Sequence, residues 1–137
     1  MSKDNDNPNI TPSTEASKTN KTQETVTFAL AQSHFLVGDI TANAEKMRAL
    51  ALQARELCAD VIIFPELALL GYPPQDLLLR PSLSGRIKSA LSTLSDIDDI
   101  VMIVGYPHVD HHGTFNSAAI LHNGHQKGFY HKQILPN

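Results

Sequence analysis

Two short apolar runs constrain the fold of this chain more than any other feature of its sequence. Residues 61–64 read "VIIF", and residues 99–105 read "DIVMIVG". A strand with one face in water alternates between apolar and polar residues, and these runs do not, so they predict buried strands, the first of them covered on both faces. Helices must then supply the covering layers, and we expect an α/β protein.

The flanking segments predict the remaining elements. Residues 25–32 favour a first strand, and Asp39 or Thr41 can cap a helix that extends to about Cys58. Residues 82–95 indicate a second helix. Each helix has apolar residues three or four positions apart, which predicts one buried stripe per helix. The stripe of the first helix holds Ile40, Ala44, Met47, Ala51, Ala54 and Cys58, and that of the second holds Ile87, Leu91 and Leu94.

The last part of the chain predicts a hairpin. Residues 114–122 and 125–132 flank Asn123-Gly124, which is a strong signal for a two-residue turn. The order of elements is then β-α-β-α-β-β-β, so we expect a layered sheet that becomes antiparallel at its far edge.

Composition bounds the organisation and the class of protein. Residues 1–24 contain one large aliphatic residue and no aromatic one, which predicts a disordered N-terminal tail before a domain at 25–137. The net charge of −3 and the lack of a basic stripe argue against nucleic-acid binding. The apolar runs are too short for a membrane span, and with one cysteine no internal disulfide can form, so we expect a cytoplasmic protein. The chain stops in "YHKQILPN" without closing an element, which indicates a partial domain.

Glu66 and Lys132 are the candidate catalytic residues. Each follows a predicted strand, and sites in α/β sheets form at the carboxyl ends of strands. At the edge of an apolar core, Glu66 is expected to lose hydration, which would disfavour its charged form and make it a better base near neutral pH. An ammonium nearby could stabilise an oxyanion, which suits acyl transfer once a nucleophile is present. The alternative is an ordinary acid at a strand end and a surface lysine.

Cys58 and the histidines offer two further possibilities. Cys58 falls on the stripe of the first helix, so we interpret it as a core residue and not as the nucleophile. Six of the seven histidines lie in the last 30 residues, and His122 and His125 could share a zinc ion across the hairpin turn. No cysteine or carboxylate cluster completes a ligand set, residues 108–112 resemble a solvated loop, and we expect no metal site.

Several motifs together resemble one family. "FPELALLGY" (64–72), "VGYPHV" (104–109), "FNSAAILHNG" (115–124) and "GFYHKQILPN" (128–137) are similar to the nitrilase, or carbon–nitrogen hydrolase, superfamily. Within it, "GYPPQDLLLRP" (71–81) resembles the glutaminase domains of glutamine-dependent NAD synthetases, except that Gln75 stands where those domains usually have Glu. The resemblance covers residues 25–137. It implies the first half of a nitrilase-like α-β-β-α layered fold.

The resemblance also implies roles. Members of the superfamily use a Glu-Lys-Cys triad, so Glu66 would be the general base and Lys132 the oxyanion-stabilising residue, while the nucleophilic cysteine would lie beyond residue 137. Tyr72, in the Gly-Tyr-Pro-Pro loop, would contact the substrate, which would be glutamine. Ammonia released from its amide would pass to a separate synthetase domain of the same chain that uses ATP and magnesium, and the complete protein would form a homo-oligomer.

Two alternatives to this function stay open. The domain could belong to another amidase of the same superfamily, or residues 25–137 could form a non-catalytic binding module.

Overall fold

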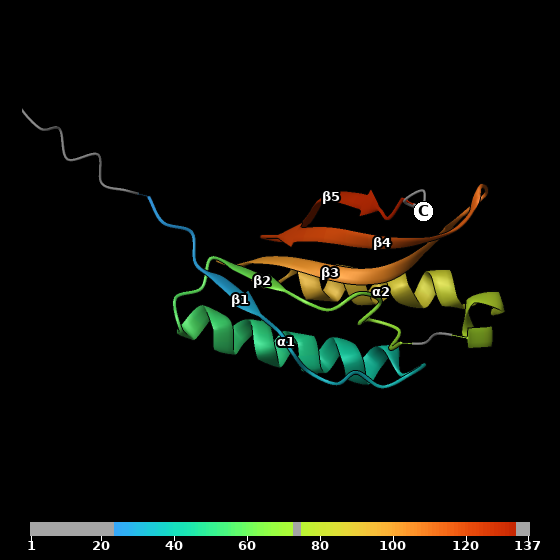
Figure 1. Ribbon diagram of the computed structural model, residues 1–137, viewed down its shortest axis with the longest axis horizontal. Coiled ribbons are helices and arrows are strands. Elements are labelled where there is room, and N and C mark those ends of the chain that lie inside the picture. Colours follow the sequence, from blue (N-terminus) through green and yellow to red (C-terminus); the bar gives the residue numbers. More distant parts are fainter. Residues whose placement is uncertain (1–23, 73–74, 134–137) are drawn as a thin grey trace, which may run out of the picture.

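The computed structural model describes residues 24–72 and 75–133, which form one mixed sheet with helices beside it (Figure 1). The predicted tail, apart from Glu24, lies outside the described residues. So do Pro73 and Pro74 and the end of the chain from residue 134. The elements are β1 (Phe28–Leu30), α1 (Ile40–Glu56), β2 (Val61–Ile63), the 3-10 helix η1 (Gln75–Leu79), α2 (Leu83–Ser95), β3 (Val101–Asp110), β4 (Gly113–His122) and β5 (His125–His131).

The strands are ordered as they occur in the sequence. β1, β2 and β3 pair in parallel, with Ala29 beside Ile62 and Ile62 beside Met102. β3, β4 and β5 pair antiparallel. This confirms the predicted sheet that becomes antiparallel at its far edge. The parallel strands bring their carboxyl ends to one edge of the sheet, where Glu66 follows β2.

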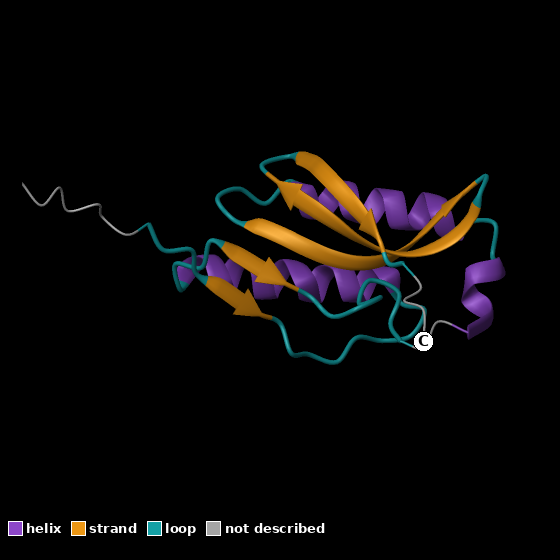
Figure 2. Ribbon diagram, turned by 45° about the horizontal axis from the view of Figure 1, so that its top comes forward, coloured by secondary structure: helices purple, strands orange, loops and turns teal. Residues whose placement is uncertain are grey.

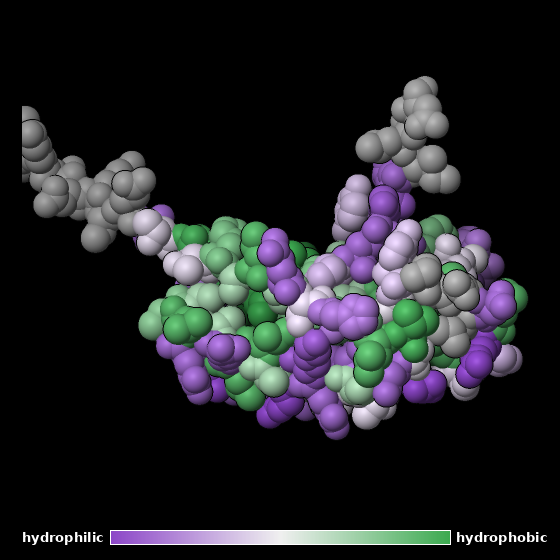
Figure 3. All heavy atoms as spheres, turned by 60° about the horizontal axis from the view of Figure 1, so that its bottom comes forward, coloured by the Kyte–Doolittle hydropathy of each residue, from purple (hydrophilic) through white to green (hydrophobic). Residues whose placement is uncertain are grey.

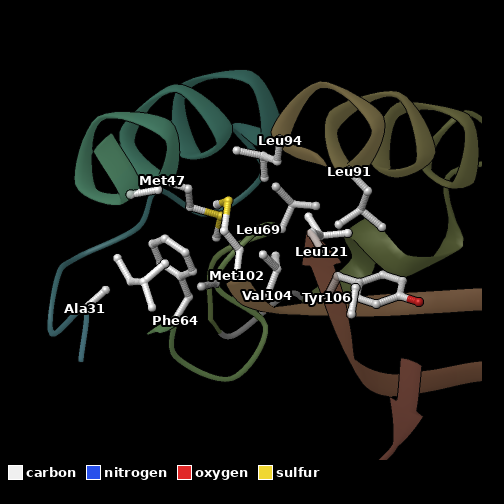
Figure 4. Close-up of a cluster of buried hydrophobic side chains, with 14 of the residues drawn as sticks. Ala31, Met47, Phe64, Leu69, Leu91, Leu94, Met102, Val104, Tyr106 and Leu121 are labelled. Carbon is white, nitrogen blue, oxygen red and sulfur yellow. The ribbon is translucent and has the colours of Figure 1, made fainter. Parts of the chain in front are cut away.

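Both α-helices pack on the same face of the sheet (Figure 2). The predicted stripe of α2 is confirmed, because Ile87, Leu91 and Leu94 are all buried. These side chains meet the inward-facing residues of the strands, and Figure 4 shows Leu91 and Leu94 above Met102 and Leu121. Burying side chains of this size stabilises the fold by about 1.5–3 kcal/mol each. No helix in the described ranges is both long and apolar enough to cross a bilayer.

Helix α1 begins as predicted but ends earlier. Its cap is Asp39, whose side chain accepts a hydrogen bond from the Ala42 amide. At the other end, the Ala59 amide donates to the Ala54 carbonyl and the Cys58 amide to the Arg55 carbonyl. These two bonds form a Schellman motif, in which the residue after the cap adopts the left-handed conformation. That residue is Cys58, with φ of 62°.

The prediction that Cys58 is buried on the stripe of α1 is therefore wrong. The left-handed backbone turns Cys58 away from the helical periodicity, and its side chain is exposed. Ala59 takes its place in the core. Cys58 also lies at the amino end of β2, at the opposite end of that strand from Glu66.

A buried polar residue on α1 holds two loops together. Asn43 is only 1% exposed, and both the nitrogen and the oxygen of its side-chain amide make hydrogen bonds. Its Nδ2 donates to the carbonyls of Leu36 and Leu69, and its Oδ1 accepts from the Leu36 amide. Leu69 belongs to the turn that follows Glu66, so Asn43 ties that turn to α1.

The second face of the sheet is largely open among the described residues. On it, Phe28 is 57% exposed, Leu30 is 66% exposed and Tyr130 is 62% exposed. The prediction that the strand at 61–64 is covered on both faces is wrong for this part of the chain: Ile62 faces the helices and is buried, whereas its neighbours are half-buried. The cause is that both α-helices lie on the side of Ile62. Figure 3 shows hydrophobic surface gathered where the described chain begins.

The hairpin of β4 and β5 confirms the predicted turn and adds an irregularity. Asn123 and Gly124 both have positive φ, as the two-residue turn requires. Beyond the turn the pairing shifts by one residue, since Leu121 pairs with Gln126 but Ile120 pairs with Gly128. Lys127 is therefore the extra residue of a β-bulge.

Strand β3 is longer than predicted and continues to Asp110. The interpretation of residues 108–112 as a solvated loop is correct for His111 and His112, which are exposed at the turn, but wrong for His108. His108 belongs to β3 and its ring stacks on that of Phe129, with 5.5 Å between centroids.

Candidate active site

The backbone after β2 places Glu66 in a tight turn against β3. The Phe64 amide donates to the Ile103 carbonyl, and the Leu69 amide donates to the Gly105 carbonyl. Between these points the chain reverses at Leu67, which has φ of 52°. A positive φ is uncommon for a bulky residue and costs free energy, so the surrounding bonds must hold the turn in place.

Gly105 makes this close approach possible. A Cβ atom built on it would lie 2.4 Å from the Pro65 carbonyl oxygen and 2.7 Å from the Leu67 nitrogen. Atoms do not approach so closely, so only glycine fits here. The position of Glu66 therefore depends on the absence of a Cβ atom at Gly105 in the neighbouring strand β3.

Lys132 reaches the same place from β5. Its amide donates to the Asn116 carbonyl at 2.7 Å, which continues the pairing of β5 with β4 by one residue. Its Nζ lies 2.6 Å from Oε1 of Glu66. The structure thus brings together two predicted site residues that are 66 positions apart in the sequence.

Asn116, on β4, is a member of the site that sequence reasoning did not single out. Its Nδ2 donates to Oε1 of Glu66 at 2.5 Å. The only signal in the sequence was a polar residue inside the strand pattern "FNSAAILH". Its relation to Glu66 required the order and register of three strands.

The hydrogen bonds lower the pKa of Glu66. The bond from Lys132 is the largest cause and the bond from Asn116 the next, while burial acts in the opposite direction. The expectation that desolvation would disfavour the charged form of Glu66 is therefore wrong, because its side chain is 46% exposed and bonded to two donors. Glu66 is held as a carboxylate at neutral pH.

The same contact raises the pKa of Lys132. Its hydrogen bond to Glu66 is the main cause, followed by the attraction between the two charges, whereas burial acts in the opposite direction. Lys132 is thus held as an ammonium. Tyr72, the predicted substrate-binding residue, is 67% exposed and lies in the loop after Glu66.

The two oxygens of Glu66 are in different situations. Oε1 accepts from both Lys132 and Asn116, whereas Oε2 accepts no hydrogen bond from the described residues. Oε2 can therefore receive a proton from an incoming group, and Lys132 keeps donor capacity for an oxygen beside it. A hollow of about 260 Å³ adjoins these residues and is walled by Ile63, Ile103, Ala118 and Tyr130 on the open face of the sheet.

A larger hollow of about 500 Å³ lies on the opposite face, between α2 and the strands, and is away from this chemistry. His108 and His125 line it. The described residues contain no group of three or more histidine, cysteine, aspartate or glutamate side chains that could hold a metal ion. His108 and His131 instead contact aromatic rings, and His131 also contacts Ser117.

The paired glutamate and lysine lie on a sheet whose protein family can be identified by comparison with known proteins. The family model for carbon–nitrogen hydrolases matches residues 27–137, and the chain belongs to that family. This confirms the resemblance carried by the motifs around Glu66 and Lys132.

The relatives narrow the class. Over 111 residues the chain is 46% identical to a glutamine-dependent NAD(+) synthetase of Acinetobacter baylyi, which covers 80% of this chain and 20% of that protein. A second such synthetase, of Synechocystis, is 41% identical over 119 residues and is covered over 21% of its length. The chain therefore spans about a fifth of the length of these relatives.

Solved structures agree on the fold. The glutamine-dependent NAD+ synthetase of Acinetobacter baumannii matches with a TM-score of 0.76 and 45% identity, over 80% of this chain and 21% of that one. An amidase of Nesterenkonia sp. matches with a TM-score of 0.71 over 82% of this chain and 44% of that one. At 24% identity the second match shows the fold alone. Together they confirm the nitrilase-like fold.

Proposed function

We propose that this chain forms the base-and-lysine part of a glutaminase that supplies ammonia for NAD synthesis. The observation that carries the proposal is the contact of 2.6 Å between Lys132 and Glu66, with the second oxygen of Glu66 left to accept a proton. The identity of 46% to a glutamine-dependent NAD(+) synthetase supports the choice of glutamine as substrate.

The proposed reaction needs a thiol in addition to these two residues. Glu66 Oε2 takes the thiol proton, and the thiolate attacks the side-chain amide carbon of glutamine. Negative charge develops on the amide oxygen, which Lys132 stabilises. Ammonia leaves with the proton held by Glu66, and water then hydrolyses the glutamyl thioester.

The thiol is proposed to come from outside residues 24–133. Cys58 is exposed at the amino end of β2, whereas Glu66 follows its carboxyl end. Tyr72 is proposed to contact the substrate from the loop beside Lys132. ATP and magnesium would serve a separate synthetase domain, in a cytoplasmic homo-oligomer, and would not act at this site.

The test compares two nitrogen sources in the full-length protein. Glu66→Gln removes the base and Lys132→Ala removes the oxyanion support, and each loss is expected to lower the rate of NAD formation from glutamine by ~10²–10³-fold. NAD formation from ammonium should persist in both variants, because ammonium bypasses the amide hydrolysis.

Matched controls exclude a general effect of lost charge. Glu45→Gln on α1 and Lys88→Ala on α2 change exposed residues of the same types outside the pair and should leave both rates unchanged. Undiminished use of glutamine by Glu66→Gln and Lys132→Ala would refute the proposal. Hydrolysis of a different amide by the wild-type protein, with none of glutamine, would instead favour another amidase of the family.

A further inference from the structure

We propose that Asn116 is a positioning residue that fixes Glu66 through its side chain and Lys132 through its backbone. The inference rests on the proposed function for its kinetic readout, but its geometry is independent of the substrate. No other described residue makes hydrogen bonds to both members of the pair.

The first contact orients the carboxylate. A carboxylate only accepts hydrogen bonds, so the amide nitrogen of Asn116 must face Glu66. It donates to Oε1, the oxygen that Lys132 also contacts. Two donors on one oxygen restrict rotation of the carboxylate and leave Oε2 without a hydrogen bond from the described residues.

The second contact places the lysine. The Asn116 carbonyl accepts from the Lys132 amide at 2.7 Å, just past the end of β5. Asn116 itself is held in the middle of the sheet, where β4 pairs with β3 on one side and β5 on the other, and it lies opposite Pro107. A residue on a paired strand is a more rigid support than a loop residue.

Such a support is needed because both charged side chains are exposed. Glu66 is 46% exposed and Lys132 is 65% exposed, and an ion pair between exposed side chains holds its geometry weakly. Catalysis depends on atoms held close to their reacting positions. Asn116 therefore supplies the fixed point that the ion pair lacks.

Three variants of the full-length protein test this role. Asn116→Ala removes the donor, and Asn116→Asp keeps the shape but places a second carboxylate beside Glu66. Asn123→Asp is the control, because it makes the same change of charge in the turn between β4 and β5. Asn123 uses its Oδ1 as an acceptor for the Asp99 amide, and aspartate retains that acceptor. Asn116→Asp also serves if Asn116→Ala fails to fold.

The kinetic result expected is a lower kcat for glutamine with little change in KM. Loss of a hydrogen bond to a charged group predicts about a tenfold to a hundredfold fall for Asn116→Ala. The acidic limb of the pH profile should move to higher pH, and further for Asn116→Asp, because a like charge disfavours the ionised Glu66. The described titratable groups that contribute to the pKa values of the pair are its own two members and Tyr72, and none of the three is altered in these variants.

A titration of the Glu66 carboxyl by ¹³C NMR, with the resonance assigned from Glu66→Gln, reads the same effect without turnover. Its midpoint should rise in both Asn116 variants and stay unchanged in Asn123→Asp. An unchanged midpoint and an unmoved pH profile in both Asn116 variants would overturn the inference. Inactivity of the wild-type protein toward glutamine would overturn the proposed function alone, since the NMR titration would still decide the role of Asn116.

Discussion

Replacing Gly105 by alanine should displace the turn that carries Glu66. The added Cβ would lie 2.4 Å from the Pro65 carbonyl oxygen, 2.7 Å from the Leu67 nitrogen and 3.1 Å from the Glu66 carbonyl carbon. Ordinary contact begins near 3.4 Å, so β3 and the turn must separate by about 1 Å. All three contacts are with backbone, so no side chain can rotate to relieve them.

Two consequences of Gly105→Ala have different magnitudes. Overpacking of this kind costs about 1–3 kcal/mol of unfolding free energy. A displacement of about 1 Å at a catalytic group can cost ~10²-fold in rate. The bonds from Phe64 and Leu69 to β3 resist the separation, so the strain should fall on the Leu67 turn and on Glu66 itself.

The assay measures denaturant unfolding and the rates of NAD formation from glutamine and from ammonium in the full-length protein. Gly85→Ala in α2 is the matched control, because a Cβ at Gly85 meets nothing within 4 Å and alanine favours a helix by about 0.5–1 kcal/mol. Gly105→Ala should lower stability and the glutamine rate, whereas Gly85→Ala should raise stability and leave both rates alone. Wild-type stability and glutamine turnover in Gly105→Ala would refute the reasoning about the turn.

Three further changes have separate outcomes. Cys58→Gly should stabilise the fold by up to about 1 kcal/mol in a thermal melt, because glycine adopts the left-handed conformation without strain; destabilisation would contradict the assignment of the Schellman motif. Asn43→Ala removes three hydrogen bonds and leaves the buried Leu69 carbonyl without its Asn43 donor, so it should lower the free energy of unfolding by about 1–3 kcal/mol in a denaturant titration. A loss below about 0.5 kcal/mol would count against a structural role for these bonds. Glu66→Gln should change stability by less than about 1 kcal/mol, since its partner is exposed. Because the pKa of Glu66 is lowered in the folded protein, the stability gained from its charge is present above its ordinary pKa of 4.5 and is lost as pH falls through the folded pKa. A pH titration of unfolding in which Glu66→Gln removes stability only below pH 4.5 would show the opposite sign.

The regular elements could be predicted because their signals are local. The stripe of α2, the cap at Asp39 and the turn at Asn123-Gly124 each depend on residues within a few positions of one another. The strand-end positions of Glu66 and Lys132 followed from the same patterns. Their contact required in addition that the two strand ends share one edge of the sheet and that the register of β5 turn Lys132 to the same face as Glu66.

The features that sequence reasoning missed depend on distant partners or on one changed torsion angle. Cys58 matches the spacing of the apolar residues of α1 in the sequence, but the helix ends before it, at the two hydrogen bonds of the Schellman motif. The pKa of Glu66 was expected to rise through burial, and it falls because two donors from β4 and the end of β5 reach it. Glycine and proline are unfavourable inside strands, so Gly105 and Pro107 argue against a long strand β3 in the sequence. In the structure, the absence of a side chain at Gly105 leaves room for the turn that carries Glu66.

The bulge at Lys127 determines whether a histidine or a lysine side chain faces Glu66. Counted from the turn without the extra residue, Asn116 would lie opposite His131, and Lys132 would point to the helix side of the sheet. With the bulge, Lys132 takes that place and His131 turns back toward Ser117. An imidazole changes charge between pH 5 and 8, whereas an ammonium does not. The single extra residue of the bulge therefore gives Glu66 a partner whose charge is constant across the physiological pH range. It does so only because side chains alternate between the two faces of a strand, so that one extra residue exchanges the faces of His131 and Lys132.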